Sequence, residues 1–178
     1  MVRSLTGRHG PVLTGGSQRR ERSAQVKEIE RKFLVISGDW RAEATAGTLI
    51  LQAYLAASDG NSARVRILGD GTATLAIKTG IGMVRDEFEY PVPVADARRM
   101  MDARIGHVID KTRHLVAHAG FVWEVDVYHD GLEGLVVAEV EMASESDCPD
   151  LPEWVGREVT GEARYSNTQL ALTGKPAA

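Results

Sequence analysis

The sequence predicts a mostly β (α+β) protein, in which eight antiparallel strands close into a barrel or tunnel with a few flanking helices. Three observations lead to this prediction. Segments with period-two alternation recur along the chain, short turns rich in Gly, Asp and Asn separate them, and charged residues alternate with apolar ones on strand after strand. The length of 178 residues suits one domain.

Eight segments carry the strand pattern. They are 27–36, 48–56, 62–69, 72–79, 83–92, 108–118, 121–129 and 135–142. The turns at 59–61, 69–71 and 80–82 have hairpin chemistry, so we expect successive strands to be antiparallel neighbours. Two helices are expected, one at 93–105, where apolar residues fall near one face, and one at 167–172.

Composition divides the chain into a flexible tail at 1–25 and a single domain at 26–178. The tail carries five arginines among Gly, Ser and Thr, with Glu21 as its one acid. It also resembles an organelle transit peptide, although it lacks a clear amphipathic stripe. The polar stretch 143–153 is expected to be a surface loop.

Composition also narrows the class of function. The chain is 43% hydrophobic and 26% charged, as in folded soluble proteins, and contains no apolar run long enough for a bilayer span or a secretory signal. Cys148, the single cysteine, excludes an internal disulfide and fits a reducing compartment. A net charge of −4 argues against general nucleic-acid binding. We therefore expect a cytoplasmic monomer or homodimer with neither a nucleic-acid nor a membrane partner.

Charged residues of both signs share one face of each predicted strand. On the first strand these are Glu28, Glu30 and Lys32. The same separation returns along the chain with Arg64, Arg66, Lys78, Glu87, Glu89, Lys111, Arg113, Glu124, Asp126, Glu139 and Glu141. On any one strand, such a face fits the solvated side of an open antiparallel sheet. Closure of the sheet into a barrel would instead turn these faces inward to line a lumen.

The charge balance of such a lumen indicates a metal and a polyanion that bind together. Its eight carboxylates outnumber its six bases by two, so an empty lumen would repel a polyphosphate. Hard divalent ions prefer oxygen ligands, and Mg²⁺ sits on one or two carboxylates together with phosphate oxygens. About two such ions would reverse the sign of the lumen charge. We expect Mg²⁺ or Mn²⁺ as the cofactor, with Arg and Lys side chains holding the phosphate oxygens.

The motifs resemble those of a known family. Residues 28–32, EIERK, match the ExExK signature of the CYTH family, the triphosphate tunnel metalloenzymes. Further blocks follow in the family's order: LQAYL at 51–55, RVR at 64–66, IKTG at 77–80, KTR at 111–113, WEVD at 123–126 and EVTGEARYSN at 158–167. The resemblance covers about 26–172 and departs at Ala53, His114 and Glu162, where glycine, an aromatic residue and aspartate are usual.

The resemblance implies a metal-dependent tunnel that acts on a small-molecule triphosphate. The metal ligands would be Glu28, Glu30, Asp126, Glu139 and Glu141, and the phosphates would be bound by Lys32, Arg64, Arg66, Lys78, Lys111 and Arg113. The resemblance also implies that Lys32 and Tyr54 orient the attacking water, for which Lys32 would need a lowered pKa. Strand parity turns Tyr54 toward the lumen, although a buried tyrosine bonded to a neighbour explains this residue equally well.

Several functions remain open on the sequence. The compact signature and short chain favour hydrolysis of inorganic tripolyphosphate to diphosphate and phosphate. A class IV-type adenylate cyclase or a thiamine triphosphatase would use the same lumen. A non-catalytic polyphosphate-binding module is the alternative from another class, although binding alone would favour bases over acids. We expect His114, His118, Trp123 and Trp154 to pack on the outer wall rather than to bind a ligand.

Overall fold

The computed structural model describes residues 26–80 and 84–176, without the side chains of 26–28 and 84–85. The predicted tail at 1–25 lies outside these residues. The described part holds nine strands, two α-helices and three short 3-10 helices. They are β1 (Val26–Val35), η1 (Asp39–Ala42), β2 (Thr48–Ser58), β3 (Asn61–Leu68), β4 (Ala73–Thr79), β5 (Val84–Pro91), α1 (Val94–Asp102), β6 (Ile105–His118), β7 (Phe121–Tyr128), η2 (Asp130–Leu132), β8 (Val136–Glu141), β9 (Val155–Glu158), η3 (Ala163–Tyr165) and α2 (Asn167–Thr173).

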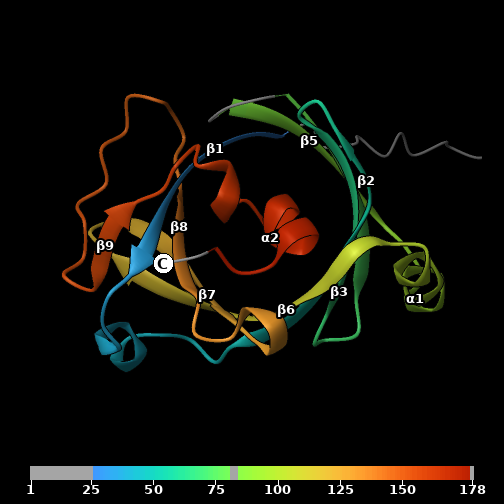
Figure 1. Cartoon of the computed structure of the whole chain (residues 1–178). Helices are drawn as coiled ribbons and strands as arrows, with labels where there is room; N and C mark the ends of the chain where they lie inside the picture. Colours follow the sequence, from blue (N-terminus) through green and yellow to red (C-terminus); the bar gives the residue numbers. More distant parts are fainter. Residues whose placement is uncertain (1–25, 81–83, 177–178) are drawn as a thin grey trace, which may run out of the picture.

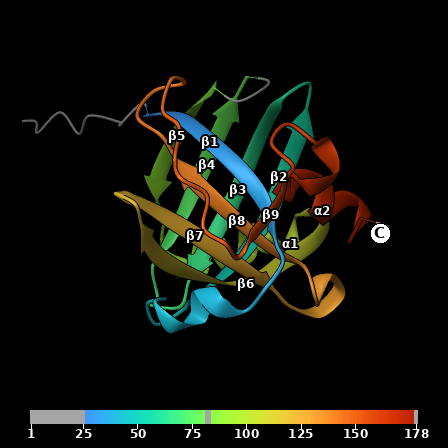
Figure 2. The same ribbon diagram turned by 90° about the vertical axis from the view of Figure 1, so that its left-hand side faces the viewer.

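The strands form one antiparallel sheet, which confirms the predicted mostly β fold. Their order is β5-β4-β3-β2-β6-β7-β8-β1-β9, and β5 pairs additionally with β1. The first eight strands therefore follow one another around a ring, which Figure 1 shows along its axis. Figure 2, from the side, shows β1 crossing the front of the ring with α2 at one end. None of the described helices has the length and apolar character needed to cross a membrane.

Strand β1 changes its neighbour on one edge partway along its length. On one edge, β8 pairs with β1 from Glu30 to Leu34. On the other edge, β5 pairs with the residues up to Ile29, and β9 pairs at Phe33 and Val35. The sequence analysis missed β9 because its four residues, VGRE, are too few to show an alternating pattern.

The helix predicted at 93–105 is shorter than expected. It ends at Asp102, and Ile105 begins β6 instead of completing the apolar face of α1. Gly106 then adopts a positive φ of 67°, which a helix does not accommodate. The sequence-based prediction was wrong here because apolar spacing alone does not distinguish the last turn of a helix from the first residue of a strand.

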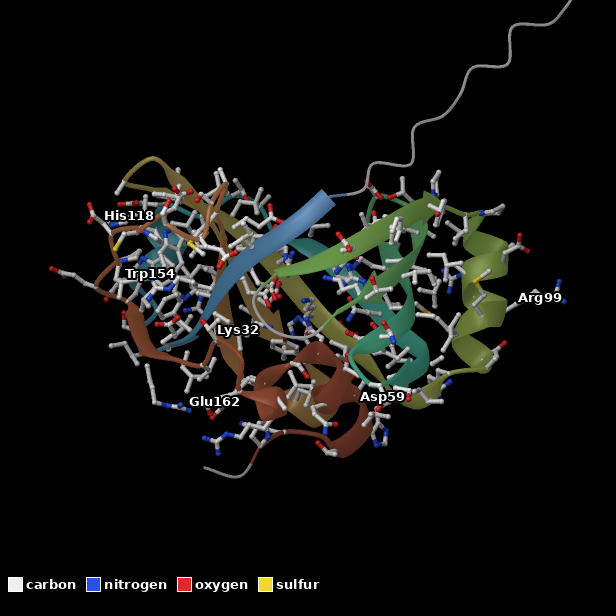
Figure 3. All side chains as sticks on the ribbon, turned by 90° about the horizontal axis from the view of Figure 1, so that it is seen from above. Lys32, Asp59, Arg99, His118, Trp154 and Glu162 are labelled. Carbon is white, nitrogen blue, oxygen red and sulfur yellow. The ribbon has the colours of Figure 1, made fainter. Side chains whose placement is uncertain are left out.

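Two apolar clusters cover the outside of the ring. One lies beneath α1, which packs against β2, β3 and β4, and is centred on Ala53, Val65 and Ala97. The other joins Trp40 of η1 to Trp123 and Trp154, whose rings meet edge to face with centroids 5.7 Å apart. His114 stacks against Trp40, so these aromatic and histidine side chains pack on the wall, as predicted. Figure 3 shows Trp154 and His118 on this side and Arg99 on the outer face of α1.

A third apolar cluster lies inside the ring at the α2 end. Its wall residues are Tyr54, Ile109, Tyr128 and Val137, which occupy the same strand faces as the charged residues farther along. Leu170 and Ala171 of α2 pack against them, and the Tyr128 hydroxyl donates to Asn167 at a distance of 2.7 Å. Ser166 caps α2 by accepting a hydrogen bond from the Gln169 N–H. The helix is thus fixed at one end of the ring, where Figure 2 shows it.

The close packing of α2 on β6 can be tested at Gly106. A Cβ at this position would lie 2.3 Å from the Ala171 carbonyl oxygen of α2, whereas a Cβ at Gly71, with a φ of 83°, would meet nothing within 4 Å. Gly71→Ala should lower the free energy of unfolding by about 1–2 kcal/mol through backbone strain alone. Gly106→Ala should cost about 1–3 kcal/mol more, because α2 must move. Urea unfolding measures both, and equal losses would contradict this account of the docking.

Candidate active site

A cavity of about 680 Å³ occupies the inside of the ring. Charged side chains from β1, β3, β4, β5, β6, β7 and β8 border it, so the alternating faces do turn inward. They are Glu30, Lys32, Arg64, Arg66, Lys78, Glu87, Glu89, Arg113, Glu124, Glu139 and Glu141. At the α2 end, uncharged polar residues join the lining, namely Ser62, Thr160, Ser166, Asn167 and Gln169, together with the acids Asp59 and Glu162. In Figure 3, Lys32 points into the interior, and Asp59 and Glu162 lie toward the α2 end.

Two residues of the predicted site lie deeper than expected, and the side chain of a third falls outside the described residues. Glu28 lies in β1, but its side chain is outside the described residues. Lys111 and Asp126 have completely buried side chains and are not among the residues that border the cavity. Their ion pair is 2.5 Å long and lies in the wall beneath Arg113. Strand parity predicted the face of the sheet on which they lie, but it carries no information about depth.

Arg113 is the centre of the acidic side of the cavity. Its guanidinium donates two hydrogen bonds of 2.7 Å to Asp126 and one of 3.0 Å to Glu139, and it also pairs with Glu124. Burial alone would lower the pKa of Arg113, but the surrounding carboxylates, above all Asp126, raise it well above its ordinary value. Arg113 is therefore a permanent cation held by three acids.

Lys32 faces the same acids from β1. Its Nζ lies 2.7 Å from Glu139 Oε1, and the two residues are direct register partners. Burial lowers the pKa of Lys32, but Glu139 and Glu30 outweigh it, so the net pKa is raised. The sequence analysis required a lowered pKa for a role of Lys32 in activating water. Beside Glu139 and Glu30, Lys32 is instead an ammonium ion.

Arg66 donates its hydrogen bonds to a neutral partner. Within the described part of the chain it forms no ion pair, and its guanidinium donates instead to the neutral Gln52 Oε1 at 3.1 and 3.3 Å. Burial and then the neighbouring Arg64 and Arg113 together lower the pKa of Arg66 to about 10, although Glu89 and Asp126 act to raise it. Three guanidinium groups thus gather where an anion would be stabilised.

Arg64 and Lys78 close the other side of the cavity. Arg64 lies 2.5 Å from Glu87 and 4.0 Å from Glu89, and Lys78 lies 3.4 Å from Glu87. Arg64 also donates to Gln52 at 3.3 Å, so one amide oxygen receives hydrogen bonds from two arginines. Each arginine and lysine of this group could exchange a carboxylate or amide partner for a phosphate oxygen.

Tyr54 borders the cavity beside this group. Its hydroxyl accepts a hydrogen bond of 3.1 Å from the Gln52 side chain, and the residue is almost completely buried. Among the described residues, no hydrogen bond links Tyr54 to Lys32. Gln52 is thus a site residue that the motifs did not identify, although its inward parity in β2 was the signal that could have found it.

The carboxylates suit a divalent metal that binds together with phosphate. Among the described residues, no three His, Cys, Asp or Glu side chains converge to form a complete metal cage. Acids instead lie directly opposite each other across neighbouring strands, Glu30 with Glu141 and Glu124 with Glu139. Like charges in such positions destabilise a sheet unless a cation lies between or beside them. Two-carboxylate sites completed by phosphate oxygens are typical of Mg²⁺.

The electrostatics of Glu124 support this assignment. Burial raises its pKa, Arg113 opposes this effect, and Glu139 and Asp126 raise the pKa further. Glu139 behaves in the opposite way, because Lys32 and Arg113 overcome the effect of burial and hold its pKa well below the ordinary value. A cation bound beside Glu124 would lower this raised pKa and so stabilise the charged form of the carboxylate.

The CYTH domain model matches residues 26–173. This chain belongs to the CYTH family. It is 40% identical over 145 residues to an inorganic triphosphatase of Acetivibrio thermocellus, with 81% of this chain and 92% of that protein covered. An inorganic triphosphatase of Nitrosomonas europaea is 34% identical over 153 residues, with coverages of 83% and 99%. The crystal structure of an inorganic triphosphatase, 32% identical, superposes with a TM-score of 0.61 over 85% of this chain and 98% of that one.

The extent of the match shows which parts belong to the CYTH domain. It begins with β1 and ends at residue 173, the last residue of α2, so the helix at the end of the ring belongs to the domain. CYTH triphosphate tunnel enzymes depend on a divalent metal, in agreement with the paired carboxylates of this cavity. The resemblance inferred from the ExExK signature and its successors is thereby confirmed.

The buried pair under the cavity gives a prediction for stability. Asp126→Asn leaves Lys111 buried without its carboxylate, so we expect the free energy of unfolding to fall by about 3–5 kcal/mol. Lys111→Met should cost less, because Arg113 still neutralises Asp126. Urea unfolding of both variants measures these losses in the free energy of unfolding. A larger loss in Lys111→Met than in Asp126→Asn would contradict the prediction.

The same pair gives a prediction for the effect of pH. Burial lowers the pKa of Lys111 to about 8, while Asp126 acts to raise it. Without Asp126, Lys111 should lose its proton at a still lower pH, and a folded state that binds fewer protons than the unfolded chain gains stability as pH rises. The difference in the free energy of unfolding between Asp126→Asn and the parent should therefore become smaller from pH 6 to about pH 8.5. If the urea midpoints of the variant and the parent stay equally far apart across this range, Asp126 does not raise the pKa of Lys111.

Proposed function

We propose that this CYTH protein hydrolyses inorganic tripolyphosphate to diphosphate and phosphate with a divalent metal, Mg²⁺ or Mn²⁺. The observation that carries the proposal is Arg66, a cation that borders the cavity, is bonded to a neutral amide and has Arg64 and Arg113 as cationic neighbours. A small anion of high charge density is the ligand that relieves such a cluster. The relatives named inorganic triphosphatase support the same substrate.

The proposed roles divide the cavity into two sides. Arg64, Arg66, Lys78 and Arg113 would bind phosphate oxygens, with Lys32 contributing its ammonium group. Lys111, buried beneath them, would act through its ion pair with Asp126 by holding Arg113 in place. Metal would be held by Glu30, Glu141, Glu139 and Glu124, with Glu28 added from the same face of β1. A bound divalent cation would stabilise the charge that develops on the transferred phosphoryl group.

Tyr54 is proposed to orient the attacking water. Its oxygen accepts a hydrogen bond from Gln52, so its own O–H remains to donate toward the cavity. Lys32 would assist as a cation that holds a phosphate oxygen. Its raised pKa speaks against a role in proton abstraction. Asp126 is proposed as a supporting residue and not as a direct metal ligand, because its side chain is completely buried and does not border the cavity.

The substrate can be tested directly. The purified protein is incubated with tripolyphosphate, thiamine triphosphate or ATP in the presence of Mg²⁺ or Mn²⁺, and phosphate, diphosphate and cyclic AMP are measured. We expect tripolyphosphate to be hydrolysed with the highest kcat/KM. Cyclic AMP as the main product from ATP, preferred thiamine triphosphate hydrolysis, or tight binding of tripolyphosphate without turnover would each contradict the proposal.

Glu30 provides a test of the metal side. Glu30→Gln keeps the size of the side chain but removes one charge from the pair with Glu141, so kcat should fall by about two orders of magnitude or more while the fold survives. Glu133→Gln, an exposed change in the turn before β8, serves as the matched control. Phosphate release and thermal melting are measured on the same preparations. A Glu30→Gln protein that melts normally and turns over at the parent rate removes this strand from the active site.

The charge balance predicts that metal and substrate bind together. Chelation of divalent ions should weaken tripolyphosphate binding by at least about tenfold, because the carboxylates of the cavity then repel the phosphates. Calorimetric titration with and without a chelator measures the effect. Equal dissociation constants in the two conditions would show that these acids do not hold a metal.

A further inference from the structure

The segment of β1 that enters the cavity lies where this strand exchanges one neighbour for another. The β5 pairing ends at Ile29, and the β9 pairing begins at Phe33. Lys32 lies at this junction, and its main-chain groups on this edge are met by the residues that follow β9. The register between two strands does not by itself fix the position of such a residue.

Thr160 supplies the missing contact. Its hydroxyl oxygen accepts a hydrogen bond of 3.0 Å from the Lys32 N–H, and the Val159 N–H donates to the Lys32 carbonyl at 2.8 Å. A tight turn holds these two residues in place, because the Glu162 N–H donates to the Val159 carbonyl and Gly161 adopts a φ of 76°. A side-chain oxygen thus does the work of a strand neighbour at the position of Lys32.

The orientation of the Thr160 hydroxyl is itself fixed. It donates a 2.7 Å hydrogen bond to Glu158 Oε1, so its lone pairs are left for the Lys32 N–H. Glu158 is held in turn by Arg31, whose guanidinium donates two hydrogen bonds of 3.0 and 2.7 Å to the two carboxylate oxygens. The contacts therefore run from Arg31 of β1 through Glu158 and Thr160 back to Lys32, the next residue of β1.

We propose that Thr160 is a positioning residue that fixes Lys32 in the cavity through its main chain. The inference rests on the proposed function, since it concerns how Lys32 meets the triphosphate. Thr160 also borders the cavity, but its proposed role is to hold the main chain of Lys32. The ammonium group of Lys32 is then placed to contact Glu139 of β8. Positioning within fractions of an ångström governs how well a cation meets a developing charge.

The test compares changes that keep or remove the hydroxyl. Thr160→Val removes it at nearly constant volume and should lower kcat by about tenfold with KM changed less than about threefold. Thr160→Ser keeps the hydroxyl and should restore most of the turnover. Thr45→Val is the matched control, because the Thr45 hydroxyl accepts a hydrogen bond of 3.1 Å from the N–H of Leu115 in β6, away from Lys32. Equal losses in Thr160→Ser and Thr160→Val, or in the two valine variants, would overturn the proposal.

A second measurement does not depend on catalysis. Hydrogen exchange of the Lys32 amide, relative to the other amides of β1, should become faster in Thr160→Val and remain near the parent rate in Thr45→Val. Unchanged protection of Lys32 contradicts the positioning role even if the parent hydrolyses tripolyphosphate. A parent without hydrolysis contradicts the proposed function alone, because amide exchange still decides the role of Thr160.

Glu158→Gln covers the case in which Thr160→Val does not fold. It weakens the acceptor that orients the Thr160 hydroxyl, so we expect the same two effects in smaller size, about threefold in kcat and a measurable loss of Lys32 protection. Adding Glu158→Gln to Thr160→Val should change neither value further, because both changes act on one chain of contacts. Parent-like exchange at Lys32 in Glu158→Gln would also overturn the proposal.

Discussion

The structure depends on one constraint: a charge turned into the ring must be stabilised there, in most cases by a partner of opposite sign. An isolated buried charge is too costly to survive, and a buried pair is tolerable when its remaining hydrogen-bonding groups are satisfied. Arg113 meets this requirement with three acids, and Asp126 meets it with two cations. Strand register provides the partners, since Lys32 lies opposite Glu139 and Arg113 opposite Asp126. The cavity is therefore lined largely by ions that neutralise one another.

This internal neutralisation explains how one cavity can suit both a polyanion and a metal. Arginines and lysines that contact carboxylates can bind phosphate oxygens instead. The carboxylates that they release are the ligands that a hard divalent cation prefers. Arg66 departs from the scheme, because its partner is the amide of Gln52. Under the proposed function, substrate and metal would enter by replacing existing contacts, so little new charge would be buried without compensation.

The sequence predicted the ring and most of the cavity because strand parity determines which side chains face inward. All eight predicted strands are present, and Arg64, Glu139 and their neighbours line the cavity as expected. Parity does not report depth, so Lys111 and Asp126 could not be distinguished from residues that border the cavity. It is also silent where the backbone is irregular. The Thr160 turn and β9 follow a polar loop without alternation, and only the three-dimensional structure brings them to β1.

The meeting of β1 with the segment after β9 also affects the order of events during synthesis. Lys32 and its hydroxyl partner are 128 residues apart in the chain, with the whole ring between them. At typical rates of about 5–20 residues per second, a ribosome needs on the order of ten seconds to make the intervening polypeptide. During that interval one edge of the first strand lacks its final neighbour, and unpaired strand edges are templates for aggregation. The nascent protein therefore cannot complete its cavity until the last part of the domain has left the exit tunnel, so emergence of this segment, rather than formation of the early hairpins, is the step that completes the site.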